Sequence, residues 1–134
     1  MPALTSYYRP PGDNGIGMHG APGYEWPFDP LTQYDQLKAY FVDMRLRYGV
    51  HHWKQLGDGS DQSIRGCQAV VEAGINCTVR LYKERPHPYY YVDPVTVAAY
   101  RAVGVVYFEW GNEPNLGAEW AGMGGGVVFG HSFV

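Results

Sequence analysis

Short apolar stretches alternate with longer segments of helical spacing along this chain, and glycine or proline marks most of the boundaries. Apolar runs of roughly four to eight residues predict strands, and apolar positions three and four residues apart predict helices. We expect strands at about 15–20, 50–56, 75–82 and 105–110, and helices at about 31–48, 63–73 and 94–103. Strands that alternate with helices in this way pair in parallel through right-handed crossovers, so the pattern predicts an α/β fold of about four βα units.

The helix boundaries carry recognisable signals. Gly49, Gly74 and Gly104 each follow a predicted helix, and glycine is the usual residue at a helix stop. Asp93 and Pro94 suit the N-cap and the first position of the third helix. In the first helix the apolar residues at mostly helical spacing are Leu31, Tyr34, Leu37, Phe41, Met44 and Leu46.

The strand at 75–82 alternates apolar and polar residues. Its apolar set is Cys77, Val79 and Leu81, and its polar set is Asn76, Thr78 and Arg80. Successive side chains of a strand point to opposite faces of the sheet, so we expect the apolar set to face the helices and the polar set to face the other side.

Composition and charge exclude several classes of partner. The 134 residues carry a formal net charge of −3, with Lys and Arg scattered along the chain, so we expect no nucleic acid partner. No run of about 20 apolar residues occurs, and residues 1–6 lack the features of a signal peptide, which predicts a soluble chain with no membrane partner. Localisation is otherwise unknown. Cys67 and Cys77 are expected to act as small buried apolar groups.

The fourth strand runs directly into Gly111, Asn112, Glu113 and Pro114. Gly111 and Pro114 stop the strand, which leaves Glu113 at its carboxyl end, where α/β folds gather their catalytic groups. A carboxyl group placed there can serve as a general acid or base. The alternative is a carboxylate that caps the following turn.

The motif YFEWGNEPN at residues 107–115 resembles the fourth strand of the retaining glycoside hydrolases that share a (β/α)8 barrel, often called clan A. It is most similar to the β-xylosidase and α-L-iduronidase type. The resemblance implies that Glu113 is the general acid/base and that Asn112 contacts the sugar 2-hydroxyl. It also implies a nucleophilic Glu on a seventh strand, for which this sequence has no counterpart.

A whole barrel takes about 250 residues, so the chain corresponds to about half of one. We therefore expect a partial TIM-type (β/α) barrel at residues 15–121, the N-terminal half of a hydrolase domain. Residues 1–14, with Pro2, Pro10, Pro11 and Gly12, predict an irregular segment, and residues 122–134 form a Gly-rich tail.

Further polar and aromatic residues fall at or near the predicted strand ends. We expect sugar contacts from His19, Trp53, Lys54, Arg80 and Trp110, because aromatic faces stack on sugar rings and polar groups bond to sugar hydroxyls. For each aromatic residue, ordinary packing is the alternative. Glu109 lies four residues before Glu113, and a carboxylate in the barrel interior needs a cation, for which Arg80 is the expected partner.

No metal or other cofactor is expected. His51 and His52 have no matching ligand spacing with His87 or His131. Residues 15–20 have the glycines of a dinucleotide loop, but no strand precedes them and prolines follow in place of a helix, so we reject nucleotide binding.

The sequence therefore predicts a glycosidase-like chain of carbohydrate metabolism whose ligand is carbohydrate. Whether it is an enzyme by itself stays uncertain, because the nucleophile-bearing half is absent from this sequence. The alternative is a non-catalytic carbohydrate-binding or partner-complementing half-barrel module, and a third interpretation is a truncated product without function. A homodimer, or a complementing half-barrel chain, is expected to cover the exposed edges of strands one and four.

Overall fold

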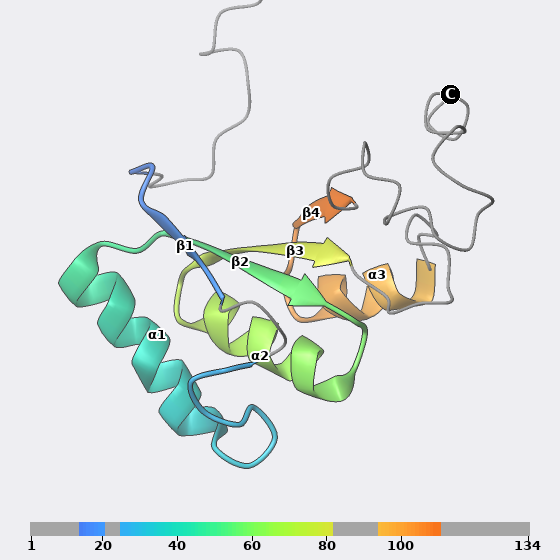
Figure 1. The fold of residues 1–134 in the computed structure, drawn as a ribbon, viewed down its shortest axis with the longest axis horizontal. Helices are drawn as coiled ribbons and strands as arrows, with labels where there is room; N and C mark the ends of the chain where they lie inside the picture. The colour runs from blue at the N-terminus through green and yellow to red at the C-terminus, as the bar shows by residue number, and fades with distance from the viewer. Residues whose placement is uncertain (1–13, 21–24, 82–93, 111–134) are drawn as a thin grey trace, which may run out of the picture.

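The computed structural model describes residues 14–20, 25–81 and 94–110 (Figure 1). In that part of the chain four strands alternate with three helices. They are β1 (Gly17–His19), α1 (Tyr34–Tyr48), β2 (His52–Gly57), α2 (Asp61–Glu72), β3 (Asn76–Leu81), α3 (Pro94–Ala102) and β4 (Tyr107–Trp110). Each corresponds to a predicted element, with bounds shifted by up to three residues. Within the same residues, no helix has the length and apolar character needed to cross a membrane.

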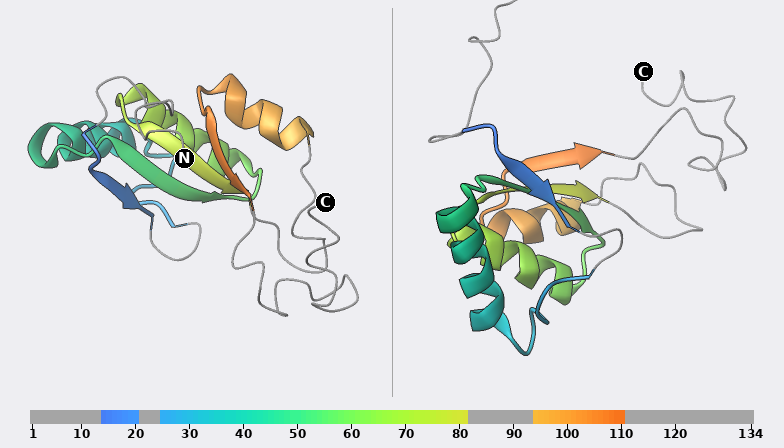
Figure 2. Two further views of the ribbon diagram at one scale, coloured as in Figure 1. Left: turned by 90° about the horizontal axis from the view of Figure 1, so that it is seen from above. Right: turned by 60° about the vertical axis from the view of Figure 1, so that its left-hand side comes forward.

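The described strands form one parallel sheet in the order β1-β2-β3-β4, which confirms the predicted α/β organisation. All three helices lie against the same face of this sheet (Figures 1 and 2). Every crossover therefore turns the same way and places its strand beside the previous one. The opposite face carries no described helix, and we call it the open face.

Strand residues alternate between the two faces as the sequence predicts. In β3, Cys77 and Val79 are buried beneath the helices, whereas Asn76, Thr78 and Arg80 are only partly covered. β2 shows the same alternation, and the register carries it across the sheet. The polar members of the open face are His19, His52, Lys54, Asn76, Thr78, Arg80, Tyr107 and Glu109.

The three expected glycine stops are confirmed. Gly49, Gly74 and Gly104 have φ angles of 67°, 83° and 97°, the left-handed region that glycine adopts without a steric penalty. α3 begins at Pro94 as predicted, whereas Asp93 lies outside the described residues. α2 begins two residues before its predicted start at residue 63, because the Ser60 hydroxyl accepts a hydrogen bond from the Ser63 amide and caps the helix.

The core lies between the sheet and the helices. Leu37 and Phe41 of α1 are fully buried, and the Phe41 ring packs edge-on against Trp26 and Trp53, with centroids 6.2 and 4.8 Å away. Burying an apolar side chain of this size contributes about 1.5–3 kcal/mol. The predicted apolar set of this helix is wrong at Leu31 and Leu46, which are 59 % and 72 % exposed. Leu31 precedes α1, and Leu46 lies outside the stripe set by Leu37 and Phe41.

Cys67 on α2 and Cys77 on β3 are both free and buried, as expected from their positions. The hydrogen bond that the Cys67 thiol makes with Cys77, together with burial, holds the pKa of Cys67 well above its usual range. Both thiols therefore act as small apolar core groups.

A hydroxyl pair ties α3 to the loop after β2. The Tyr100 hydroxyl lies 2.7 Å from the Ser63 hydroxyl and accepts a 3.1 Å hydrogen bond from the Gly59 amide. A Cβ atom on Gly57 would approach Val79 to 2.4 Å and the Tyr100 hydroxyl to 2.7 Å, so this position has no room for a side chain. The carboxyl end of β2 is thereby fixed against α2 and α3.

Candidate functional site

The candidate site is the carboxyl-terminal part of the open face, where polar residues from neighbouring strands form two rows. The strand register places His19, Lys54, Thr78 and Tyr107 in one row. The next row lies two residues further along the strands and contains Leu56, Arg80 and Glu109. Polar groups from all four described strands therefore share one surface.

Glu109 binds two cations from different strands. Arg80 donates hydrogen bonds to Glu109 Oε1 from Nε, at 3.1 Å, and from Nη2, at 2.5 Å. Lys54 forms an ion pair with the other carboxylate oxygen, Oε2. The predicted pairing of Arg80 with Glu109 is confirmed, and Lys54 is a second partner that the sequence analysis missed. We call these three residues the charge triad.

The charge triad keeps Glu109 ionised. Partial burial alone would raise the pKa of the Glu109 carboxyl group, but the hydrogen bonds and charges of Lys54 and Arg80 outweigh that effect and lower it. A carboxyl group with a lowered pKa is a poor proton donor at neutral pH. Glu109 is therefore suited to anchor the two cations and not to serve as a general acid.

A hollow of about 270 Å³ lies beside the charge triad on the β1 side of the open face. Its lining residues are Gly17, Met18, His19, His52, Trp53, Lys54 and Thr78. Three of the predicted sugar-binding residues, His19, Trp53 and Lys54, thus line one hollow. His19 Nδ1 lies 3.1 Å from the Gly20 carbonyl oxygen, so in the neutral ring Nδ1 donates to that oxygen and Nε2 is left as an acceptor.

Trp53 occupies a packing position. It neighbours Lys54 in β2, so its side chain points to the opposite face of the sheet, where it is 5 % exposed. Its ring packs against Phe41, and its Nε1 donates a 3.1 Å hydrogen bond to Gln55 Oε1. Trp53 is therefore a packing residue and not a sugar contact, because its ring face is not accessible for stacking on a sugar.

The remaining predicted site residues are Trp110, Asn112 and Glu113. Trp110 is the last residue of β4 and pairs with Leu81, while its side chain lies outside the described part of the structure. Asn112 and Glu113 also lie outside the described residues. Their roles stay predictions.

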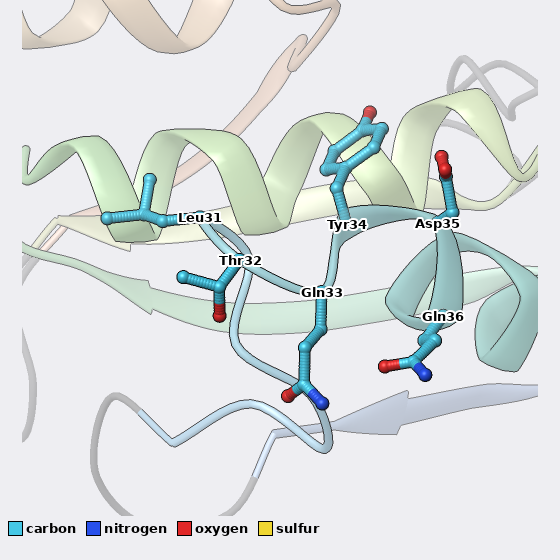
Figure 3. Close-up of a pocket in the computed structure, with 6 residues that line it drawn as sticks. All are labelled: Leu31, Thr32, Gln33, Tyr34, Asp35 and Gln36. Carbon is cyan, nitrogen blue, oxygen red and sulfur yellow. The ribbon is translucent and has the colours of Figure 1, made fainter.

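A second hollow, of about 480 Å³, lies beside the start of α1 and is formed by six consecutive residues, Leu31 to Gln36 (Figure 3). Figure 3 shows the side chains of Gln33 and Tyr34 pointing to opposite sides of this segment. The Arg65 guanidinium of α2 lies 3.6 Å from the centre of the Tyr34 ring. Among the described residues its lining comes from this one segment, so the described part of the hollow brings no catalytic groups together from different elements.

Metal ligands are not clustered in the described ranges. Within 14–20, 25–81 and 94–110, no three His, Cys, Asp or Glu side chains are placed to hold one ion. The chemistry that the described site offers is hydrogen bonding from Lys, Arg, His, Thr and Tyr around one ionised carboxylate.

No protein-family model matches this chain, and no curated protein or solved structure shows significant similarity to it.

Proposed function

We propose that this chain is glycoside hydrolase-like and binds carbohydrate over the open face, at the carboxyl ends of its strands. The topology supports this proposal. Doubly wound sheets reverse their strand order and carry helices on both faces, whereas a (β/α) barrel adds each strand next to the previous one with every helix outside. The order β1-β2-β3-β4 with helices on one face follows the second pattern. On this proposal the open face is part of a barrel interior.

The observation that carries the proposal is the charge triad and its position. Lys54, Arg80 and Glu109 come from three neighbouring strands, and Glu109 precedes Glu113 by only four residues. A polar face of this kind has no use as a packing surface for a helix, because burial of polar groups without partners costs free energy. It suits a ligand covered with hydroxyl groups, which exchange hydrogen bonds with Lys, His and Thr side chains.

The proposed roles follow from the protonation states. Glu113 would protonate the leaving oxygen and later activate a water molecule, while Asn112 would contact the sugar. Glu109 stays ionised and holds Lys54 and Arg80 in place. Lys54 has three N–H donors and directs one toward Glu109, so the ammonium group can also bind sugar hydroxyls.

A second candidate function is carbohydrate binding without turnover. Retaining hydrolysis needs two carboxyl groups about 5–5.5 Å apart. On the open face of the described strands Glu109 is the single carboxylate, and two cations occupy it. This observation favours a binding module that is completed by other carboxylates or has no catalytic activity.

Hydrolysis of a panel of aryl glycosides by the purified chain tests the proposal, with Glu113→Gln as the paired variant. Turnover that disappears in Glu113→Gln supports a glycosidase. Saturable sugar binding without turnover, unchanged in Glu113→Gln, supports the binding module. A folded chain that neither binds nor hydrolyses any sugar of the panel contradicts both.

A further inference from the structure

Of the three residues in the charge triad, only Lys54 lines the hollow on the open face. The hollow is formed by residues of β1, β2 and β3, including Lys54 and Thr78, whereas Arg80 and Glu109 are not among its lining residues. In the strand register Lys54 lies in the row of Thr78, one row before Arg80 and Glu109. Arg80 and Glu109 therefore influence a ligand in the hollow through Lys54.

Arg80 is committed to one oxygen of Glu109. Its Nε and Nη2 both donate to Oε1, at 3.1 and 2.5 Å. Because the guanidinium group is planar and rigid, two of its N–H groups on one oxygen restrict rotation of the carboxylate. Arg80 is also the least exposed side chain of the charge triad, at 22 % against 37 % for Lys54. These contacts suit a residue that holds its neighbour and not one that reaches a ligand.

Lys54 is oriented by the second oxygen of the same carboxylate. Its side chain extends from β2 past β3, and its ammonium group pairs with Glu109 Oε2 on β4. A lysine side chain is long and has many rotamers, so holding its ammonium group in one place requires such an anchor. The direction of Oε2 fixes where the Lys54 ammonium group lies, and Arg80 fixes that direction through Oε1.

We infer that Arg80 is a positioning residue for ligand binding: it holds Glu109, and Glu109 holds the Lys54 ammonium group beside the hollow, where that group donates to sugar hydroxyls. The inference rests on the proposed function for the identity of its ligand. The sequence led us to expect a direct sugar contact from Arg80, and the inference replaces that role with an indirect one.

A double-mutant cycle on sugar affinity separates the indirect role from a direct one. The sugar panel is titrated into Arg80→Gln prepared in the wild-type and in the Lys54→Met background. A residue that acts through Lys54 loses its effect once Lys54 is removed, whereas a direct contact costs affinity in both backgrounds. We expect Arg80→Gln to weaken binding by at least about fivefold in the wild type and by less than about twofold in Lys54→Met. Equal losses in both backgrounds, or no loss in either, would overturn the inference.

A second measurement needs no ligand. The protons of a lysine ammonium group exchange rapidly with water unless hydrogen bonds retain them, so the nitrogen-resolved NMR signal of the Lys54 ammonium group reports its contact with Glu109. Both Glu109→Gln and Arg80→Gln should broaden or remove this signal. The Lys38 ammonium group, paired with Glu72 at 2.9 Å, should keep its signal in both variants, which also verifies that they are folded. Glu72→Gln is the matched control and should affect Lys38 alone.

The NMR measurement keeps this inference distinct from the proposed function. A folded wild-type chain that binds no sugar contradicts the proposed function, and the Lys54 signal then decides by itself whether Arg80 holds Lys54. A Lys54 signal that is lost in Glu109→Gln but unchanged in Arg80→Gln would overturn the inference. Arg80→Lys, which keeps the positive charge but not the paired N–H donors, takes the place of Arg80→Gln if that variant does not fold.

Discussion

Arg80 on β3 directs both Nε and Nη2 to one oxygen of Glu109 on β4, at 3.1 and 2.5 Å. The second oxygen of the same carboxylate pairs with Lys54 on β2. One carboxylate thus connects three strands across the face that the described helices leave uncovered. The charge triad fixes the positions of the polar groups that we propose to bind carbohydrate.

Replacement of Glu109 by Gln should destabilise the chain, because Arg80 and Lys54 would lose their common counter-charge while remaining close together. Exposed ion pairs contribute about 0–1 kcal/mol, and breaking a buried pair costs about 3–5 kcal/mol. The Glu109 and Arg80 side chains are 35 % and 22 % exposed, so we expect a loss of about 1–2 kcal/mol. Urea unfolding measures it. Asp43→Asn, which breaks the more exposed pair with Arg47, should have a smaller effect.

Glu109 should also make stability depend on acidity. Its pKa is lower in the folded chain than in the unfolded chain, where it has the ordinary glutamate value. The stabilisation is therefore complete above the ordinary value and is lost as the pH falls through the lowered one, because the unfolded state then binds the proton first. Unfolding free energies of the wild type and Glu109→Gln should converge as the pH falls. A difference that stays constant with pH would contradict this role for Glu109.

Tyr100→Phe tests the hydroxyl pair that fixes the loop after β2. It removes the contacts to the Gly59 amide and the Ser63 hydroxyl, at 3.1 and 2.7 Å, and should cost about 1–2 kcal/mol. Burial raises the pKa of Tyr100 to about 12, above an ordinary value of 10. Between these values the native chain keeps a proton that the unfolded chain has lost, so stability falls with rising pH by up to about 1.4 kcal/mol per unit.

The part of the alkaline loss of stability that comes from the Tyr100 hydroxyl should therefore be absent in Tyr100→Phe. Tyr48→Phe is the control, since Tyr48 is 63 % exposed at the end of α1. Unfolding free energies measured on either side of the interval between pH 10 and 12 give the comparison. If the unfolding free energy fell equally steeply with pH in the wild type and in Tyr100→Phe, the raised pKa of Tyr100 would be contradicted.

Gly66→Ala tests whether Trp26 is a packing residue. Alanine usually stabilises a helix interior by about 1 kcal/mol relative to glycine. A Cβ atom on Gly66, however, would lie 2.2 Å from the Trp26 ring, so the ring must move and the core must repack. We expect a net loss of about 1–3 kcal/mol by urea unfolding. Stabilisation by Gly66→Ala would show that the Trp26 ring can move away from position 66 at no cost in free energy, which would contradict a packing role. Gln62→Ala on the exposed side of α2 supplies the reference substitution.

The order of strands and helices could be predicted from the sequence because local signals mark it. Gly49, Gly74 and Gly104 stop helices by a conformation that glycine adopts most readily, and Pro94 starts one. Arg80 and Glu109 could be paired because a buried carboxylate needs a cation and both residues lie on adjacent predicted strands. These are properties of single residues and of nearest neighbours.

Other features of the site depend on distances that the sequence does not contain. Lys54 reaches past β3 to Glu109 through a long flexible side chain, so its partner is set by the twist and spacing of the sheet. Trp53 and Lys54 are adjacent in β2 and cannot share a face, and only the strand register decides which of the two points away from the helices. Gln55 is an unexpected buried polar residue, satisfied by the Trp53 ring nitrogen.

The most direct measurement is calorimetric titration of a sugar panel into the wild type, Lys54→Met and Lys38→Met. Lys54 and Lys38 are each ion-paired to a glutamate and are 37 % and 40 % exposed, but only Lys54 lies on the open face. A carbohydrate site on the open face predicts an affinity at least about tenfold lower in Lys54→Met and nearly unchanged in Lys38→Met. Equal affinities in the two variants, or no sugar bound by the folded wild-type chain, would contradict it.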